Sequence, residues 1–149
     1  EITFVKNKKS IQMKKILFLT LSILILTNVL SAQEATYQLS SHILDITQGK
    51  PASNVKISLS KQDKKGNWNI IDEKYTDENG RIKNFLKEEK GTDHKGIYKL
   101  TFFTEPYFKK MSQESFYPFI DVVFELKDNN HYHVPITLSP FGYSTYRGN

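Results

Sequence analysis

Residues 131–149 read HYHVPITLSPFGYSTYRGN and contain two β-type runs joined by a Ser-Pro-Phe-Gly turn. The first run, His131 to Leu138, opens with two histidines spaced two apart, and the second covers Tyr143 to Arg147. Apolar β-branched and aromatic residues dominate both runs, as is typical of strands. Residues i and i+2 of a strand point to the same face. We therefore expect a β-hairpin at this end of the chain, with His131 and His133 on the same side of one strand.

Similar runs recur towards the N-terminus at short intervals, separated by turn signals such as Asp-Glu-Asn-Gly at residues 77–80. Only Glu105 to Gln113 is predicted as a helix, with Pro106 in its first turn, where a missing N–H costs little. The other predicted strands are Leu39–Asp45, Val55–Ser60, Trp68–Tyr75, Arg81–Leu86, Ile97–Phe103 and Asp121–Leu126. About eight strands and one short helix indicate an all-β sandwich with Greek-key-like connections.

The region before Gln33 has a different character. Two lysines follow Met13, residues 16–30 are almost all apolar, and the small residues Ser31 and Ala32 come next. This order is typical of a secretory signal peptide, and the apolar run is shorter than the roughly 20 residues that span a bilayer. We expect residues 13–32 to be a signal peptide that directs the protein to the periplasm or the exterior. Residues 1–12 are then an upstream extension outside the fold, and residues 33–149 form one domain.

The net charge of +5 belongs mostly to this leader. Five of the 21 basic residues and one of the 16 acidic residues precede residue 33, so the remainder carries 16 basic and 15 acidic side chains. This balance gives no reason to expect nucleic-acid binding, or stable membrane association once the leader is removed. The chain contains no cysteine, so an exported domain would depend on packing or assembly instead of disulfides.

A few side chains are candidates for chemistry on residue type and spacing alone. His131, His133 and the distant His42 could form a three-histidine zinc site. They could instead transfer protons without a metal, or they could be ordinary strand-surface histidines. Arg81, which follows the Asn-Gly turn, could bind a planar polar substrate through its fork of donors or be a surface cation. Arg147 at the end of the chain could add a second cation beside the imidazoles.

Seven segments together resemble the transthyretin-like family, and specifically its 5-hydroxyisourate hydrolases. They are LSSHILD (39–45), GKPA (49–52), TDENGR (76–81), GIYKL (96–100), YFKK (107–110), FYP (116–118) and the block HYHVP…LSPFGYSTYRG. The resemblance covers essentially the whole chain after the leader. Its C-terminal block is the most specific part, because the hormone carriers of the same fold lack it. The resemblance implies a transthyretin-like Greek-key β-sandwich.

The resemblance also implies an activity: hydrolysis of 5-hydroxyisourate to 2-oxo-4-hydroxy-4-carboxy-5-ureidoimidazoline in purine catabolism, with no metal ion and no cofactor. The residues it implies as catalytic are His42, Arg81 and His133, and those implied to bind substrate are His42, Arg81, Tyr146 and Asn149. It further implies a homotetramer, a dimer of dimers with active sites in a central channel. The family usually ends in serine, so we expect Asn149 to alter efficiency. The alternative is a non-enzymatic carrier of a small ligand, of the transthyretin type.

Overall fold

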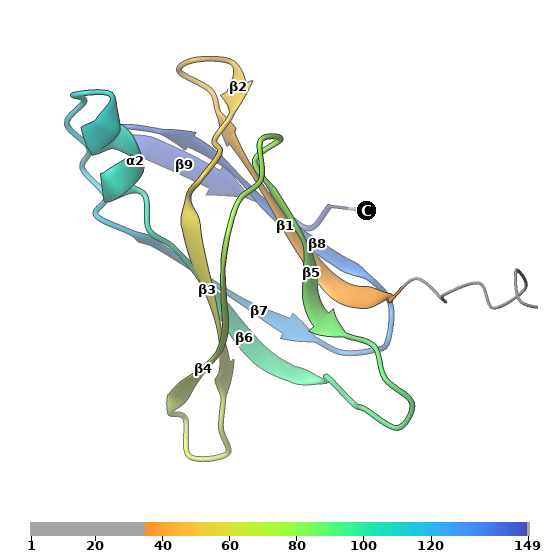
Figure 1. Ribbon diagram of the computed structural model, residues 1–149. Helices are drawn as coiled ribbons and strands as arrows, with labels where there is room; N and C mark the ends of the chain where they lie inside the picture. Colours follow the sequence, from red (N-terminus) through yellow and green to blue (C-terminus); the bar gives the residue numbers. More distant parts are fainter. Residues whose placement is uncertain (1–34, 149) are drawn as a thin grey trace, which may run out of the picture. The chain divides into compact units, whose positions relative to one another are not determined.

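The computed structural model describes residues 35–148, which form two β-sheets packed face to face (Figure 1). The elements are β1 (Tyr37–Asp45), β2 (Lys50–Pro51), β3 (Lys56–Gln62), β4 (Trp68–Tyr75), β5 (Arg81–Lys87), β6 (Gly96–Phe102), α2 (Glu105–Lys110), β7 (Ile120–Leu126), β8 (Tyr132–Ser139) and β9 (Gly142–Thr145). Sheet A has the order β2-β1-β8-β9, and β5 also pairs with β1. Sheet B has the order β4-β3-β6-β7. The predicted all-β sandwich is therefore confirmed.

Three predicted details were wrong. The helix ends at Lys110 and not at Gln113, because Met111 leaves helical geometry and Ser112 takes a positive φ of 54°. The last strand ends at Thr145 and not at Arg147. Two residues of the turn after the first strand, Lys50 and Pro51, instead form a short edge strand on β1, a position where a proline's missing N–H is tolerated.

The core lies between the two sheets and follows the period-2 pattern of the strands. Its largest fully buried side chains are Leu39, Ile43, Ile57, Leu59, Phe85, Tyr98, Leu100, Phe102, Phe108, Ile120, Leu126 and Ile136. Burial of such a side chain contributes about 1.5–3 kcal/mol. Phe108 comes from α2, which lies at one end of the sandwich (Figure 1). This packing fixes which face of each strand remains available for chemistry.

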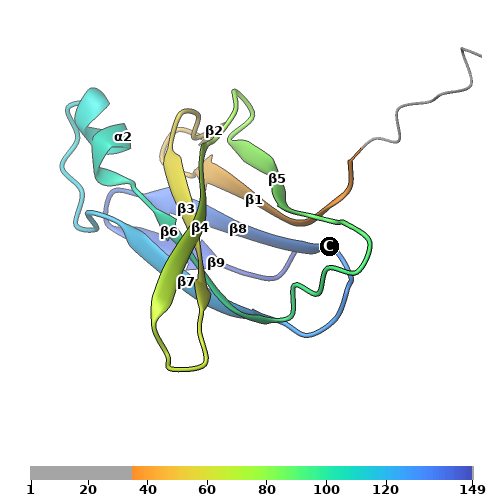
Figure 2. The same cartoon turned by 60° about the horizontal axis from the view of Figure 1, so that its bottom comes forward.

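The face of sheet A that points away from the core is the one that matters for function. On β1, Leu39, Ser41 and Ile43 are buried, so the intervening Ser40 and His42 point outward and are half-buried. The same alternation leaves His133 of β8 half-buried and facing outward. The turned view shows β5, β1 and β8 side by side (Figure 2).

Two expectations fall on residues without a described structure. The upstream extension and the signal peptide lie before residue 35, and Asn149 lies after residue 148. Within residues 35–148, no helix is long and apolar enough to cross a membrane.

Candidate active site

Pairing of the strands brings three predicted site residues to one place on sheet A. His42 lies directly opposite Arg81 in the antiparallel pair of β1 and β5. His133 lies opposite Ser40 in the parallel pair of β1 and β8. Because Ser40 and His42 are two residues apart on one face of β1, the two histidines and the arginine converge across three adjacent strands.

A tight turn at the start of β5 sets the position of Arg81. The side chain of Asp77 accepts hydrogen bonds from the backbone N–H groups of Asn79 (2.9 Å) and Arg81 (2.8 Å). Gly80 takes a positive φ of 69°, and its carbonyl accepts a hydrogen bond of 2.9 Å from the N–H of Ile43. A Cβ at Gly80 would lie 2.6 Å from the carbonyl oxygen of Ile43. Only glycine therefore allows the turn to dock against β1 and deliver Arg81 beside His42.

Electrostatics at this position favour neutral imidazoles. The pKa of His42 lies below its usual value, first because of burial and then because of the positive charge of Arg81; a backbone hydrogen bond with Asn79 and the carboxylate of Asp77 oppose this. The pKa of His133 is lowered by the same two causes in the same order, with smaller contributions from His42 and His131. A neutral imidazole has a lone pair and can act as a base near neutral pH.

His131 has its own set of partners. Its Nδ1 lies 2.9 Å from the carbonyl oxygen of Tyr37, and its Nε2 lies 2.8 Å from the hydroxyl oxygen of Ser40. That hydroxyl oxygen is also 2.8 Å from Nδ1 of His133. No cluster of three or more His, Cys, Asp or Glu side chains in the described part of the chain is arranged to hold a metal ion. The three-histidine zinc site considered from the sequence is therefore not formed here.

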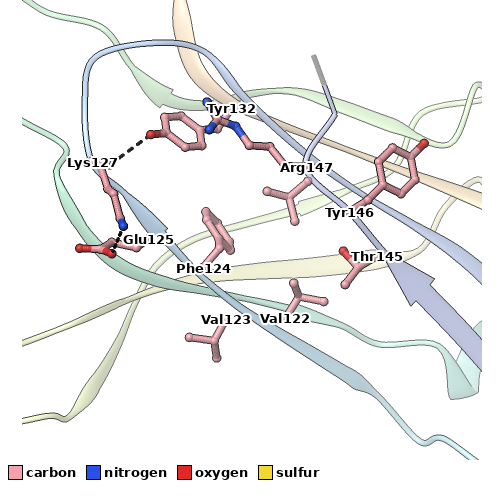
Figure 3. A pocket seen from close by; sticks show the side chains of 10 residues that line it. Val122, Val123, Phe124, Glu125, Lys127, Tyr132, Thr145, Tyr146 and Arg147 are labelled. Atoms are coloured by element: carbon pink, nitrogen blue, oxygen red, sulfur yellow. Dashed lines mark hydrogen bonds and ion pairs between the residues drawn. The ribbon is translucent and has the colours of Figure 1, made fainter.

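The sequence suggested that Arg147 could lie beside the imidazoles, but the structure places it elsewhere. The guanidinium of Arg147 stacks over the ring of Tyr132 at 4.5 Å, away from the imidazoles. With Tyr132 it lines a cavity of about 390 Å³ between β7 and the C-terminal segment (Figure 3). The ring of Tyr146 points away from Arg147 in this view and is 59% exposed. Among the described residues, its hydroxyl has no hydrogen-bond partner.

Two residues at the site were missed from the sequence. Ser40 bridges two histidines, and its spacing of two from His42 was the signal that could have placed it on the same face. Gly148 forms a bridge with β8 through a hydrogen bond of 2.9 Å from its N–H to the carbonyl of His133. A Cβ at Gly148 would lie 2.6 Å from Cδ2 of the His133 ring, so this glycine makes room for the imidazole.

Comparisons with known proteins all find relatives in one family. A Caenorhabditis elegans relative named probable 5-hydroxyisourate hydrolase is 44% identical over 133 residues, covering 89% of this chain and 96% of the relative. The structure of Klebsiella pneumoniae 5-hydroxyisourate hydrolase matches with a TM-score of 0.63 at 32% identity, over 78% of this chain and 100% of that one.

A second solved structure, sea bream transthyretin in complex with thyroxine, matches with a TM-score of 0.68 at 30% identity, over 74% of this chain and 94% of that one. The transthyretin-like fold expected from the resemblance is thereby confirmed. Residues 39–148 match the model of the HIUase/Transthyretin family, and the chain belongs to that family.

Proposed function

We propose that this protein hydrolyses 5-hydroxyisourate, with His42, Arg81 and His133 as its catalytic residues. The observation that carries the proposal is the direct pairing of His42 with Arg81, with His133 on the adjacent strand of the same sheet face. The names of the hydrolase relatives support the choice of substrate. The lowered pKa values of both histidines support a role in proton transfer.

The reaction opens a ring at a cyclic amide carbonyl. One imidazole takes a proton from water while the water oxygen bonds to the carbonyl carbon. The resulting imidazolium gives this proton to the ring nitrogen as the C–N bond breaks, directly or through the second imidazole, which takes up one proton and releases another. A base and acid of this kind contribute about 10²–10⁴-fold. The guanidinium of Arg81 holds the substrate and stabilises the negative charge that develops on the carbonyl oxygen.

Arg81 has a second effect on the same chemistry. Its fixed positive charge lowers the pKa of both neighbouring histidines, because like charges at short range disfavour each other. The two imidazoles therefore stay neutral to more acidic pH than a solvated histidine does. Tyr146 and Asn149 complete the proposed site by binding the substrate, and the exposed phenol of Tyr146 is available for this contact.

We also propose that the protein is a homotetramer built as a dimer of dimers. Sheet A ends at β9 and sheet B ends at β7, and unpaired edge strands readily pair with another chain. Large apolar side chains are exposed at these edges and in the nearby loops, including Phe116, Phe119, Val123, Phe141 and Tyr143.

Light scattering of the purified protein tests the proposed tetramer. A tetramer for the wild type and a smaller species for Val123→Lys, on the edge strand β7, are expected; a monomeric wild type would contradict it.

The activity is tested by following the ultraviolet absorbance of 5-hydroxyisourate generated from urate by urate oxidase. We expect the wild type to accelerate the decay, a chelator to leave the rate unchanged, and His133→Asn to remove the acceleration. Inhibition by the chelator would favour a zinc hydrolase instead. Decay at the spontaneous rate with wild-type protein would refute the proposal.

A carrier is the second candidate, and the match to a thyroxine complex of transthyretin is what favours it. In a carrier, wild-type protein and His133→Asn would bind a small aromatic ligand equally well, and neither would turn over the substrate.

Export through the leader is also part of the proposal. N-terminal sequencing of the protein recovered outside the cytoplasm should begin at Gln33, and recovery of an uncleaved chain would contradict it.

A further inference from the structure

The hydroxyl group of Ser40 contacts two imidazoles at once. Its oxygen lies 2.8 Å from Nε2 of His131 and 2.8 Å from Nδ1 of His133. A hydroxyl has one hydrogen to donate and two lone pairs with which to accept. It can therefore donate to only one of these nitrogens and must accept from the other.

A backbone carbonyl decides which way the hydroxyl points. Nδ1 of His131 lies 2.9 Å from the carbonyl oxygen of Tyr37, and a carbonyl oxygen can only accept. The proton of neutral His131 is thus on Nδ1, and its Nε2 must be an acceptor. Ser40 donates to that Nε2, so its oxygen accepts from Nδ1–H of His133. The proton of neutral His133 is then on Nδ1, and its Nε2 has the free lone pair.

We infer that Ser40 and His131 are positioning residues that hold His133 in the tautomer with Nδ1 protonated, so that its Nε2 serves as the base that activates water. This inference rests on the proposed hydrolase function and assigns the water-activating base within it. His42 lies opposite Arg81 in the pair of β1 and β5 and is outside this chain of hydrogen bonds. The imidazolium that forms on His133 then gives its proton to the leaving nitrogen, which returns His133 to its neutral form.

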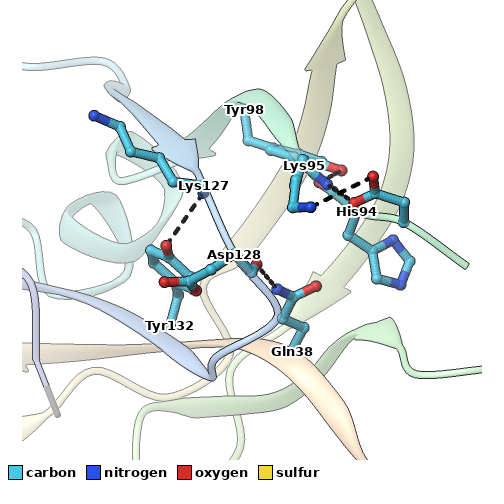
Figure 4. A network of polar contacts seen from close by, with 8 residues as sticks. Gln38, His94, Lys95, Tyr98, Lys127, Asp128 and Tyr132 are labelled. Atoms are coloured by element: carbon cyan, nitrogen blue, oxygen red, sulfur yellow. Dashed lines mark hydrogen bonds and ion pairs between the residues drawn. The ribbon is translucent and has the colours of Figure 1, made fainter.

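The segment that presents His131 is anchored well enough to support such a role. The side-chain amide of Gln38, which is only 2% exposed, donates a hydrogen bond of 2.6 Å to the carbonyl of Asp128. The N–H of Lys127 donates a hydrogen bond of 3.2 Å to the hydroxyl of Tyr132 (Figure 4). The first contact holds the loop between β7 and β8 against β1, the second ties the loop to the start of β8, and His131 follows directly from this loop.

The experiment reads the tautomer and the rate separately. ¹⁵N-labelled histidine in the full-length protein distinguishes protonated from unprotonated ring nitrogens by NMR at pH 8. In the wild type we expect Nδ1 of His133 to be protonated and Nε2 to be unprotonated. Ser40→Ala and His131→Phe should each shift the proton of His133 towards Nε2 and lower kcat by about 10–100-fold, by analogy with the loss of a partner that orients a metal-bound imidazole.

Two controls separate positioning from a loss of folding. Ser40→Thr keeps the hydroxyl and should restore both the tautomer and most of kcat. Ser115→Ala removes another serine with two partners, the carbonyls of Tyr117 and Pro140, near the opposite end of β8, and should change neither quantity.

The outcomes also separate this inference from the proposed function. Wild-type protein that leaves the substrate to decay spontaneously overturns the proposed function and the inference with it. An active wild type whose His133 carries its proton on Nε2 overturns the inference alone. So does an active Ser40→Ala variant with kcat within two-fold of the wild type.

Discussion

Gly148→Ala tests whether the C-terminal segment shapes the active site by leaving space. The added Cβ would lie 2.6 Å from Cδ2 of His133 and 3.3 Å from both Cβ and Cγ of the same side chain. Since ordinary van der Waals contact begins at 3.4 Å, the ring and the terminal segment must move apart by about 0.8 Å. Gly148 does not have a positive φ that would strain an alanine backbone, so the effect comes from this contact alone.

The expected loss is large in activity and small in stability. Misplacing a catalytic group by about 1 Å can reduce the rate about 100-fold, which corresponds to ~2.7 kcal/mol of transition-state free energy. The terminal segment is mostly exposed and can release the clash by giving up the hydrogen bond from Gly148 N–H to the His133 carbonyl. That loss lowers the free energy of unfolding by only about 1 kcal/mol.

The assay combines kcat/KM from the ultraviolet decay of 5-hydroxyisourate with thermal unfolding of the same samples. Gly142→Ala is the matched control, because its Cβ would meet only the hydroxyl of Ser139, at 3.6 Å, and it lies on the same hairpin. We expect kcat/KM to fall about 100-fold for Gly148→Ala and to remain unchanged for Gly142→Ala. A Gly148→Ala enzyme within two-fold of the wild type would refute the argument that this glycine makes room for His133.

Further predictions concern the two histidines and the turn that positions Arg81. Because the pKa values of His42 and His133 lie below 6.5 in the folded protein, activity should persist to acidic pH and decline with a midpoint below 6.5. Folding stability contributed by these groups should be complete above pH 6.5 and decrease as pH falls towards the lowered values, since the unfolded chain then binds more protons. Arg81→Gln should raise both pKa values in an NMR titration; unchanged values would show that burial alone sets them. Gly80→Ala should lower the free energy of unfolding by about 3 kcal/mol through its positive φ and its clash with a backbone carbonyl. Gly66→Ala, with a positive φ but open space around it, should lower it by only about 1 kcal/mol, and equal losses in chemical denaturation would contradict the role of the clash.

Strand positions were largely predictable because each strand has one buried face. The alternation of Val55, Ile57 and Leu59 places β3 correctly to within two residues, and Trp68–Tyr75 agrees at both ends. The helix end was not predictable, since Met111 and Ser112 leave helical geometry although their residue types do not forbid a further turn. Short edge pairing at Lys50 and Pro51 likewise depends on the neighbouring strand.

The sequence by itself determined the type and approximate extent of the secondary structure and, through its motifs, the family. These properties depend on local periodicity and on residue identity, which a linear pattern contains. Only the tertiary structure decided that β1 runs parallel to β8 and pairs with β5 on its other side, which brings His42, Arg81 and His133 together. It also decided that Ser40 links His131 to His133 and that Arg147 turns away to Tyr132. Contacts between residues about 40 to 90 positions apart depend on strand order and register, which only the folded chain fixes.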